Sequence, residues 1–233
     1  MNPPALRLLS AGAAQGLANE LAPRLRAVAG AELHSTFMPA GAVRERFLAG
    51  DACDVVVTTP AMLDEFARDG RVDRRTISSI GRVHTAIAVR GGDPAPAIDT
   101  PERFGAAVSS ARRIFLPDPQ RATAAIHFVK VLRALGLYES LHARLSAHPN
   151  GAAAMAALAS TADADCLGCT QTTEILATQG VKLVGALPAP LDLATVYAGA
   201  VCTSARDADV ARRFLALLCG PEGSELRRAA GFE

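Results

Sequence analysis

The stretch Phe47-Leu48-Ala49-Gly50-Asp51-Ala52-Cys53-Asp54-Val55-Val56-Val57-Thr58-Thr59-Pro60 indicates how this chain folds. An apolar helical face ends at Gly50, because glycine is the residue type that most often closes a helix. The run Asp54–Thr58 is continuously apolar at its centre, which is typical of a strand buried on both faces. Pro60 then stands where proline suits the first turn of a helix. A helix end, a buried strand and a helix start therefore follow one another directly.

The residues before this stretch repeat the alternation twice. Strands are expected at Leu6–Ser10 and Glu32–Phe37, each followed by a pattern of apolar residues at helical spacing, and Gly30 ends the first helix. Because strands that alternate with helices pair in parallel, the sequence predicts an α/β fold.

The alternation continues to the C-terminus. Strands are expected at Ile77–Val89 (one strand, or two divided at Gly81), Arg113–Leu116, Leu145–His148, Asp165–Thr170, Val181–Leu187 and Thr195–Cys202. Helices are expected after the N-cap Thr100, at Thr123–Leu135 and Ala152–Ser160, and on both sides of Gly220-Pro221. Since the alternation starts afresh near residue 84, we expect two lobes of similar design.

The composition excludes several classes of protein. Of the 233 residues, 50% are hydrophobic and 20% are charged, and the net charge is +1, so neither a charged tail nor a nucleic-acid partner is expected. No apolar run reaches the ~18 residues of a membrane span. The first residues do not have the pattern of a signal peptide, which predicts a cytoplasmic protein, or a periplasmic one if a signal peptide was trimmed.

Several segments together resemble a known family. They are Leu8–Ala13, Ser35–Phe37, Phe47–Val57, Gly180–Gly185, Phe214–Pro221 and Ala230–Phe232. In this order they resemble the molybdate-binding-protein family of solute receptors. The resemblance implies a two-lobe type II periplasmic-binding-protein fold of mixed, mainly parallel sheets flanked by helices. Lobe one would be residues 1–83 plus 196–233 and lobe two 84–195, with two crossover strands between the lobes and a ligand cleft between them.

The resemblance also implies where the ligand binds. The family places a serine after the first strand, where Ala13 stands three positions beyond Ser10, and a second serine after the second strand, where this chain has Met38-Pro39-Ala40-Gly41. It places a tyrosine where Gln171 stands. Backbone amides at helix N-termini bind anions without side chains. We therefore expect a small anionic ligand, an organic acid rather than molybdate, and a transporter as partner if a signal peptide was removed.

Further polar residues lie in loops that follow the expected strands, where the two lobes would contact a ligand. Arg121 precedes a helix, and its guanidinium suits a carboxylate; the alternative is a solvated arginine or an ion pair with Asp118. Thr123 is expected as a helix N-cap, with ligand contact as the second interpretation. Thr58 and the cluster Thr170-Gln171-Thr172-Thr173 follow strands, where ligands collect in open α/β sheets. The candidate ligand-binding residues are Ser10, Gly12, Ala13, Gly41, Thr58, Arg121, Thr123, Asn150, Thr170, Gln171 and Tyr197.

The cysteines predict neither a disulfide framework nor a metal site, since they are five in number and irregularly spaced. Cys166 and Cys169 have thioredoxin-like spacing, but they fall on an expected strand, where residues three apart point to opposite faces. Cys202 and Cys219 do not complete a zinc site with them. No cofactor and no metal are therefore expected.

Two other functions remain open. The same cleft could hold an enzyme that isomerises or decarboxylates a small carboxylic acid, with His127, His148 and Asp118 as the candidate acid–base groups. A sensor domain like the effector half of a transcription regulator is the third hypothesis, although no helix-turn-helix pattern or basic patch accompanies it.

Overall fold

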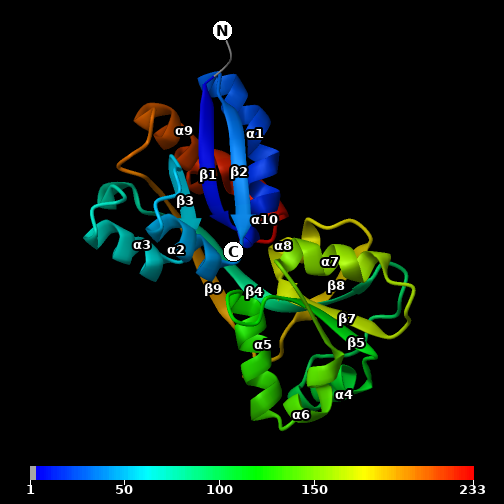
Figure 1. Ribbon diagram of the computed structural model, residues 1–233. Coiled ribbons are helices and arrows are strands. Elements are labelled where there is room, and N and C mark those ends of the chain that lie inside the picture. The colour runs from blue at the N-terminus through cyan, green and yellow to red at the C-terminus, as the bar shows by residue number, and fades with distance from the viewer. Residues whose placement is uncertain (1–3) are drawn as a thin grey trace. The chain divides into compact units, whose positions relative to one another are not determined.

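The computed structural model describes residues 4–233, which form two compact units (Figure 1). One unit comprises the chain up to Arg82 together with Val196–Glu233, and the other is Val83–Thr195. The chain passes from one unit to the other within strands β4 (Ser78–Arg90) and β9 (Ala194–Val201). Residues 1–3 lie outside the described residues. The expectation that the N-terminus has no signal peptide falls partly on them. Among residues 4–233 no helix is both long and apolar enough to cross a membrane.

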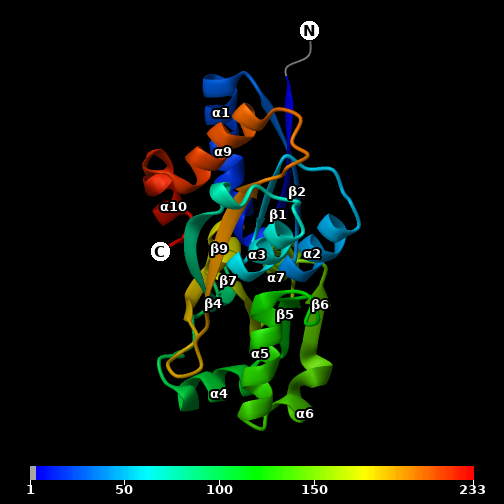
Figure 2. The same ribbon diagram turned by 90° about the vertical axis from the view of Figure 1, so that its left-hand side faces the viewer.

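The first unit is built on three parallel strands. These are β1 (Ala5–Ala11), β2 (Glu32–Met38) and β3 (Val55–Thr58), with β1 in the centre and β9 added antiparallel to β3. Helices α1 (Gln15–Ala29), α2 (Ala40–Leu48) and α3 (Pro60–Arg68) each follow one of these strands. All residues of β3 are buried, as its valine run predicts. Helices α9 (Ala208–Cys219) and α10 (Ser224–Ala229) complete the unit, and α9 runs beside α1 (Figure 2).

The second unit repeats this strand order. Strand β5 (Arg113–Pro117) lies between β6 (Leu145–His148) and β7 (Cys166–Gln171), all parallel, and β4 and β8 (Val181–Ala186) extend the sheet beyond β7 with antiparallel pairing. Helices α5 (Thr123–Ala134), α7 (Gly151–Ser160) and α8 (Thr172–Leu176) follow β5, β6 and β7. Helices α4 (Pro101–Ser110) and α6 (Tyr138–Leu141) stand outside this repeat. The order β6-β5-β7 therefore corresponds to β2-β1-β3.

Short 3₁₀ turns connect several of these elements. They are η1 (Gly12–Ala14), η2 (Arg74–Thr76), η3 (His142–Arg144) and η4 (Pro221–Gly223).

The two faces of the second sheet have separate apolar cores. Cys169 packs with Phe104, Phe128 and their neighbours, whereas Cys166 packs with Met155, Leu158 and the alanines of the other face. The prediction that the two cysteines point to opposite faces of a strand is confirmed, and the pair cannot act as a thioredoxin-like motif.

Gly168 lies between these cysteines, where a side chain would press against Met155 and Leu158. A Cβ atom at this position would lie 2.6 Å from Met155 Cε and 2.8 Å from Leu158 Cδ2. Both atoms are the ends of flexible side chains, so Gly168→Ala should lower the free energy of unfolding by about 1 kcal/mol, the low end of the range for overpacked cores. Chemical denaturation measures this. Gly105→Ala is the control, since its nearest foreign atom is 3.8 Å away and alanine favours the α4 helix; an equal loss in both variants would contradict the packing argument.

Some expected elements differ from the structure. The N-cap of α5 is Ala122, which has extended backbone angles, and Thr123 is the first helical residue, so the predicted N-cap is wrong. Residue Ala49, not Gly50, is the C-cap of α2, and Gly50 follows with a left-handed φ of 97°. Strand β4 continues through Gly81 as one strand. Thr100 is confirmed as an N-cap, because its hydroxyl accepts a hydrogen bond from the Arg103 N–H.

Candidate functional site

The first unit brings two candidate residues to the ends of adjacent strands. The chain leaves β1 for one neighbour, β2, and later returns to the other, β3, so the carboxyl ends of β1 and β3 flank a topological switch point, where α/β sheets bind ligands. Ser10 lies near the end of β1 and Thr58 ends β3, and both are completely buried. The Ser10 hydroxyl donates to the Ala11 carbonyl at 2.9 Å, and the Thr58 hydroxyl donates to Met62 Sδ at 3.1 Å.

The helices that start at this edge have no side-chain caps. The N-caps of α1, α2 and α3 are Ala14, Pro39 and Thr59, and none of them makes a capping hydrogen bond through its side chain. No acidic residue lies in the first turn of any of the three. Gly41 is the second residue of α2, and Gly12 and Ala13 form the buried turn η1 before α1. The N–H groups of these first turns therefore present an uncompensated positive field to an anion.

The corresponding helix of the second unit, α5, is also uncapped. Its N-cap Ala122 has no side chain that could cap it, and Thr123 is half-buried in the first turn. Arg121 lies directly before this turn and is exposed. The loop is held by backbone hydrogen bonds to the Asp118 carbonyl, from Ala122 at 2.9 Å and from Arg121 at 3.3 Å. An arginine thus stands beside an uncapped helix N-terminus.

Helices α7 and α8, which follow β6 and β7, differ from these uncapped helices because side chains cap their N-termini. Asn150 is the N-cap of α7, and its Oδ1 accepts from the Ala153 N–H at 2.8 Å. Gln171 is buried as the N-cap of α8 in a reciprocal capping box with Glu174. These contacts give Asn150 and Gln171 structural roles; their contact with a ligand stays a prediction.

A buried carboxyl group, Glu174, lies at the N-terminus of α7. Its Oε2 accepts from the Thr170 hydroxyl at 2.5 Å, and a side chain at Gly151 would collide with both groups. Burial raises the pKa of Glu174, and the hydrogen bonds from Thr170 and from the Gln171 and Gly151 N–H groups oppose that rise without cancelling it. Glu174 was not among the predicted site residues, since glutamate is usually exposed.

The raised pKa of Glu174 predicts a pH-dependent stability. The folded state binds the Glu174 proton more tightly than the unfolded state, whose pKa is about 4.3, so this stabilisation is complete below about pH 4 and is lost as the pH rises through the folded pKa. In Glu174→Gln this loss should disappear, because the amide does not ionise.

Urea denaturation at several pH values tests this. The free energy of unfolding of the native chain should fall relative to Glu174→Gln as the pH rises from about 4. Glu225→Gln on α10 is the control, since Glu225 is exposed in the first turn of a surface helix. A difference that stays constant with pH would contradict a raised pKa.

Three buried hydroxyl groups near β4 and β7 have no hydrogen-bond partner among residues 4–233. They belong to Thr85, Thr173 and Thr195. Thr85 pairs with Gln171 across the two strands, and its N–H donates to the Leu193 carbonyl at 3.0 Å, which brings β4, β7 and the segment before β9 together. A buried polar group without a partner costs about 1–3 kcal/mol, a cost that a bound ligand can offset.

Thr85 and Thr195 were not among the residues predicted for the site. The sequence holds no signal for either hydroxyl, because threonine is common in strands and the pairing of its hydroxyl depends on contacts between distant segments. Tyr197, which was predicted, is buried on β9. Its contact with a ligand stays a prediction.

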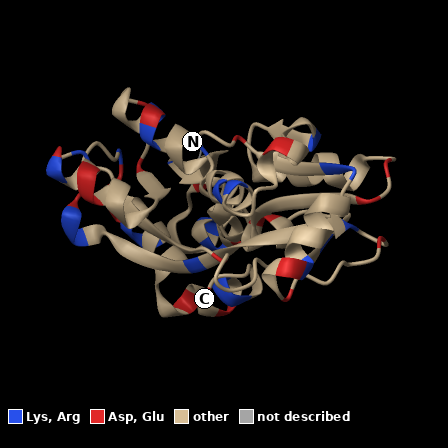
Figure 3. Ribbon diagram, turned by 90° about the horizontal axis from the view of Figure 1, so that it is seen from below, with Lys and Arg blue, Asp and Glu red and all other residues tan. Residues whose placement is uncertain are grey.

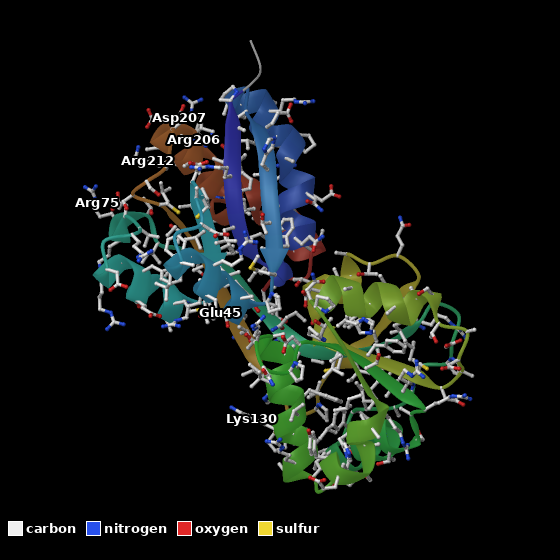
Figure 4. The ribbon with its side chains drawn as sticks, in the orientation of Figure 1. Glu45, Arg75, Lys130, Arg206, Asp207 and Arg212 are labelled. Carbon is white, nitrogen blue, oxygen red and sulfur yellow. The ribbon has the colours of Figure 1, made fainter. Side chains whose placement is uncertain are left out.

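The charged residues elsewhere do not form a single-sign surface. Figure 3 shows lysine and arginine interspersed with aspartate and glutamate over both units. Arg206, Asp207 and Arg212 lie toward the amino ends of β1 and β2, away from the strand ends that carry Ser10 and Thr58 (Figure 4). These three residues therefore lie apart from the uncapped helix starts that follow β1 and β3.

The three candidate acid–base groups lie in the second unit. His148 ends β6 opposite Pro117 of β5, and its ring stacks on Phe115 with centroids 5.7 Å apart. Burial lowers the pKa of His148, which keeps its imidazole neutral at pH 7. Asp118 directly follows Pro117, at the same edge of the sheet. His127 Nε2 is 2.7 Å from the Leu191 carbonyl oxygen on another segment. Among the described residues, no group of His, Cys, Asp and Glu could hold a metal ion.

Comparison with known proteins gives a match over most of the chain. Residues 6–233 match a family model described as bacterial extracellular solute-binding protein. An aconitate isomerase from Pseudomonas sp. is 25% identical over 98% of this chain and 87% of its own.

Solved structures show the same fold. The periplasmic molybdate-binding protein of Azotobacter vinelandii has a TM-score of 0.79 at 20% identity and covers 98% of both chains. The sulfate-binding protein SubI of Mycobacterium tuberculosis has a TM-score of 0.74 at 15% identity over 98% of this chain and 86% of its own. The expected two-lobe type II fold is therefore confirmed.

Proposed function

This chain belongs to the bacterial extracellular solute-binding protein family, and we propose that it binds a small organic anion at the carboxyl ends of its parallel strands. The observation that carries the proposal is the set of uncapped helix N-termini. Helices α1, α2, α3 and α5 start after strands β1, β2, β3 and β5 without a side-chain cap and without an acidic residue in the first turn. Such helix starts bind anions through their N–H groups.

Three features favour a carboxylate over a tetrahedral oxoanion. Arg121 offers a planar pair of donors that matches a carboxylate in two parallel hydrogen bonds. The unpartnered hydroxyls of Thr85, Thr173 and Thr195 suit a ligand with several polar groups. The positions where the resemblance implies serines hold Ala13 and Met38-Pro39-Ala40-Gly41 instead. The relative named aconitate isomerase supports a tricarboxylate as the anion.

A thermal-shift screen tests this function. The panel is molybdate, tungstate, sulfate, phosphate and mono-, di- and tricarboxylates including trans-aconitate, citrate and malate. A ligand at about 100 times its Kd stabilises a protein by about 2.7 kcal/mol, which for a chain of this size raises the Tm by roughly 5–10 °C. We expect that rise with di- or tricarboxylates. A rise with molybdate or sulfate alone would contradict the organic-anion proposal, and no rise across the panel would contradict anion binding.

The proposal also concerns the cellular location of the protein and its transporter partner. The family description is extracellular, whereas the N-terminal sequence predicted a cytoplasmic location. Fractionation of the producing cells with antibody detection distinguishes the two. A transporter partner is expected only if the protein is found outside the cytoplasm.

A second candidate function is the isomerisation of a small carboxylic acid, favoured by the likeness to aconitate isomerase over 98% of the chain. Moving a double bond next to a carboxylate requires a group that removes a proton and returns it at another carbon. His148 is the candidate best placed for this, since its neutral imidazole lies at the same edge of the sheet as Asp118 and the start of α5.

Proton NMR of trans-aconitate incubated with the protein in D₂O tests the second function. Enzymatic turnover would replace the starting signals by those of the other isomer, with deuterium at the exchanged carbon. His148→Gln should abolish turnover and leave binding intact, and His142→Gln, which changes an exposed histidine of η3, is the control. An unchanged spectrum over many hours would exclude isomerisation of this acid and leave the binding function in place.

A further inference from the structure

Two cysteines of the first unit meet although they are far apart in the sequence. Cys53 Sγ lies 3.3 Å from Cys202 Sγ, across 149 positions of the chain, and both residues are only 2% exposed. All five cysteines are free thiols in the structure. The proposed anion site does not include this contact.

The surrounding backbone holds the two thiols in place. Strands β3 and β9 are antiparallel with Val55 opposite Val201, and just beyond this pair the Cys202 N–H donates to the Asp54 carbonyl at 2.9 Å. Cys202 also forms an isolated antiparallel bridge with Val72. Asp54, next to Cys53, is bound by the Arg7 side chain. Both cysteines are therefore anchored by neighbours that do not depend on the thiols themselves.

We propose that Cys53 and Cys202 form a redox-active pair that closes to a disulfide when the protein meets a low-molecular-weight disulfide. A disulfide needs an S–S distance near 2.05 Å, so the sulfur atoms have to approach by little more than 1 Å. The hydrogen bond between the thiols and their burial raise the pKa of Cys202, which disfavours its thiolate.

A cavity lies beside one of the two cysteines. Its volume is about 540 Å³, and it is lined by Arg7, His34, Ser35, Arg46 and Cys53, with Cys202 outside the lining. The Cys53 residue is therefore the first to react and Cys202 is the resolving one. This order follows from access, because the attacking thiolate has to reach a sulfur of the reagent.

The reaction balances as two exchange steps with oxidised glutathione as the reagent. The Cys53 thiolate attacks one sulfur of the glutathione disulfide, which forms a mixed disulfide and releases one glutathione thiolate. The Cys202 thiolate then attacks the Cys53 sulfur, forms the Cys53–Cys202 bond and releases the second glutathione thiolate. The two protons lost by the protein thiols are taken up by the two released thiolates, so the protein loses two electrons and glutathione disulfide gains them.

Thiol counting and peptide mapping test the proposal on the full chain. After equilibration with oxidised glutathione, the number of thiols titrated under denaturing conditions should fall by two from the initial five. Mass spectrometry of an unreduced digest should find the Cys53 peptide joined to the Cys202 peptide. The same treatment is repeated while the denatured chain refolds, so that slow access to the buried thiols cannot hide the product.

Cysteine-to-serine variants test whether the lost thiols are those of Cys53 and Cys202. Cys166→Ser with Cys169→Ser should still lose two thiols, because those residues lie in different cores. Cys53→Ser and Cys202→Ser should each abolish the linkage. The proposal is overturned if Cys53 and Cys202 remain thiols after both treatments, if a mixed disulfide at Cys53 persists without closing, or if other cysteine pairs form instead.

Discussion

Replacing Asp54 by alanine should lower the free energy of unfolding by about 2–4 kcal/mol, because it removes a buried carboxylate and leaves the half-buried Arg7 without its partner. The Asp54 residue is 2% exposed and the side chain of Arg7 is 20% exposed. Arg7 donates to Asp54 from Nε at 3.0 Å and from Nη2 at 2.7 Å. The N–H groups of Arg7 and Arg206 donate to the same carboxylate at 2.8 Å and 2.9 Å. Alanine would leave all four donors unsatisfied.

Urea denaturation at neutral pH measures this loss as a lower midpoint at an unchanged slope. Asp209→Ala is the control, since Asp209 is 84% exposed and pairs with Arg212 only at the surface of α9; it should change stability by less than about 1 kcal/mol. A loss below about 1 kcal/mol in Asp54→Ala as well would contradict the assigned role of Asp54 in joining β1, β3 and the start of α9.

The Asp54 contribution should also depend on pH. Burial alone would raise the pKa of Asp54, but hydrogen bonds from Arg7 and from the Arg206 and Arg7 N–H groups outweigh burial and lower it. The stabilisation is therefore present above the unfolded pKa of about 3.9 and is lost as the pH falls through the lower folded pKa. The difference in stability between the native chain and Asp54→Ala should shrink below about pH 4, and the opposite trend would contradict a lowered pKa.

The second large effect is on binding. Arg121→Ala should weaken the affinity for the carboxylate found in the thermal-shift screen by about 10- to 100-fold, because two charge-assisted hydrogen bonds are lost. Calorimetric titration measures the affinity. Arg112→Ala is the control, since Arg112 is also an exposed arginine, but it precedes the amino end of β5, opposite the end that leads to Arg121. Equal affinity in the Arg121 variant would remove this arginine from the site.

Most elements could be predicted from the sequence because burial acts on local patterns. The valine run of β3 and the alternation of strands with helices through β7 gave strand positions within a few residues. The N-cap of α5 could not be predicted in the same way, because Ala122 and Thr123 stand side by side and only the backbone angles decide which is extended. Helix α8 was missed because five residues are too few to show a helical period.

The candidate site was predictable only in part. Strand ends followed by glycine, alanine and threonine pointed to the loops after β1, β3 and β5. Tertiary contacts decide the rest. The buried Glu174 depends on the packing of α8 against Gly151, and the unpartnered Thr85 hydroxyl depends on strand pairing. The contact between Cys53 and Cys202 spans 149 positions, so no local pattern announces it.

The central claim is that uncapped helix N-termini hold the anion, and backbone amide NMR tests it most directly. A ¹H–¹⁵N spectrum is recorded while the carboxylate from the thermal-shift screen is added. Four N–H signals should move with a common saturation curve. They belong to Ala13 in η1, Ala14 at the start of α1, Gly41 in α2 and Ala124 in α5. Saturable shifts that leave these signals in place and move others would show that the anion binds elsewhere and would contradict the account.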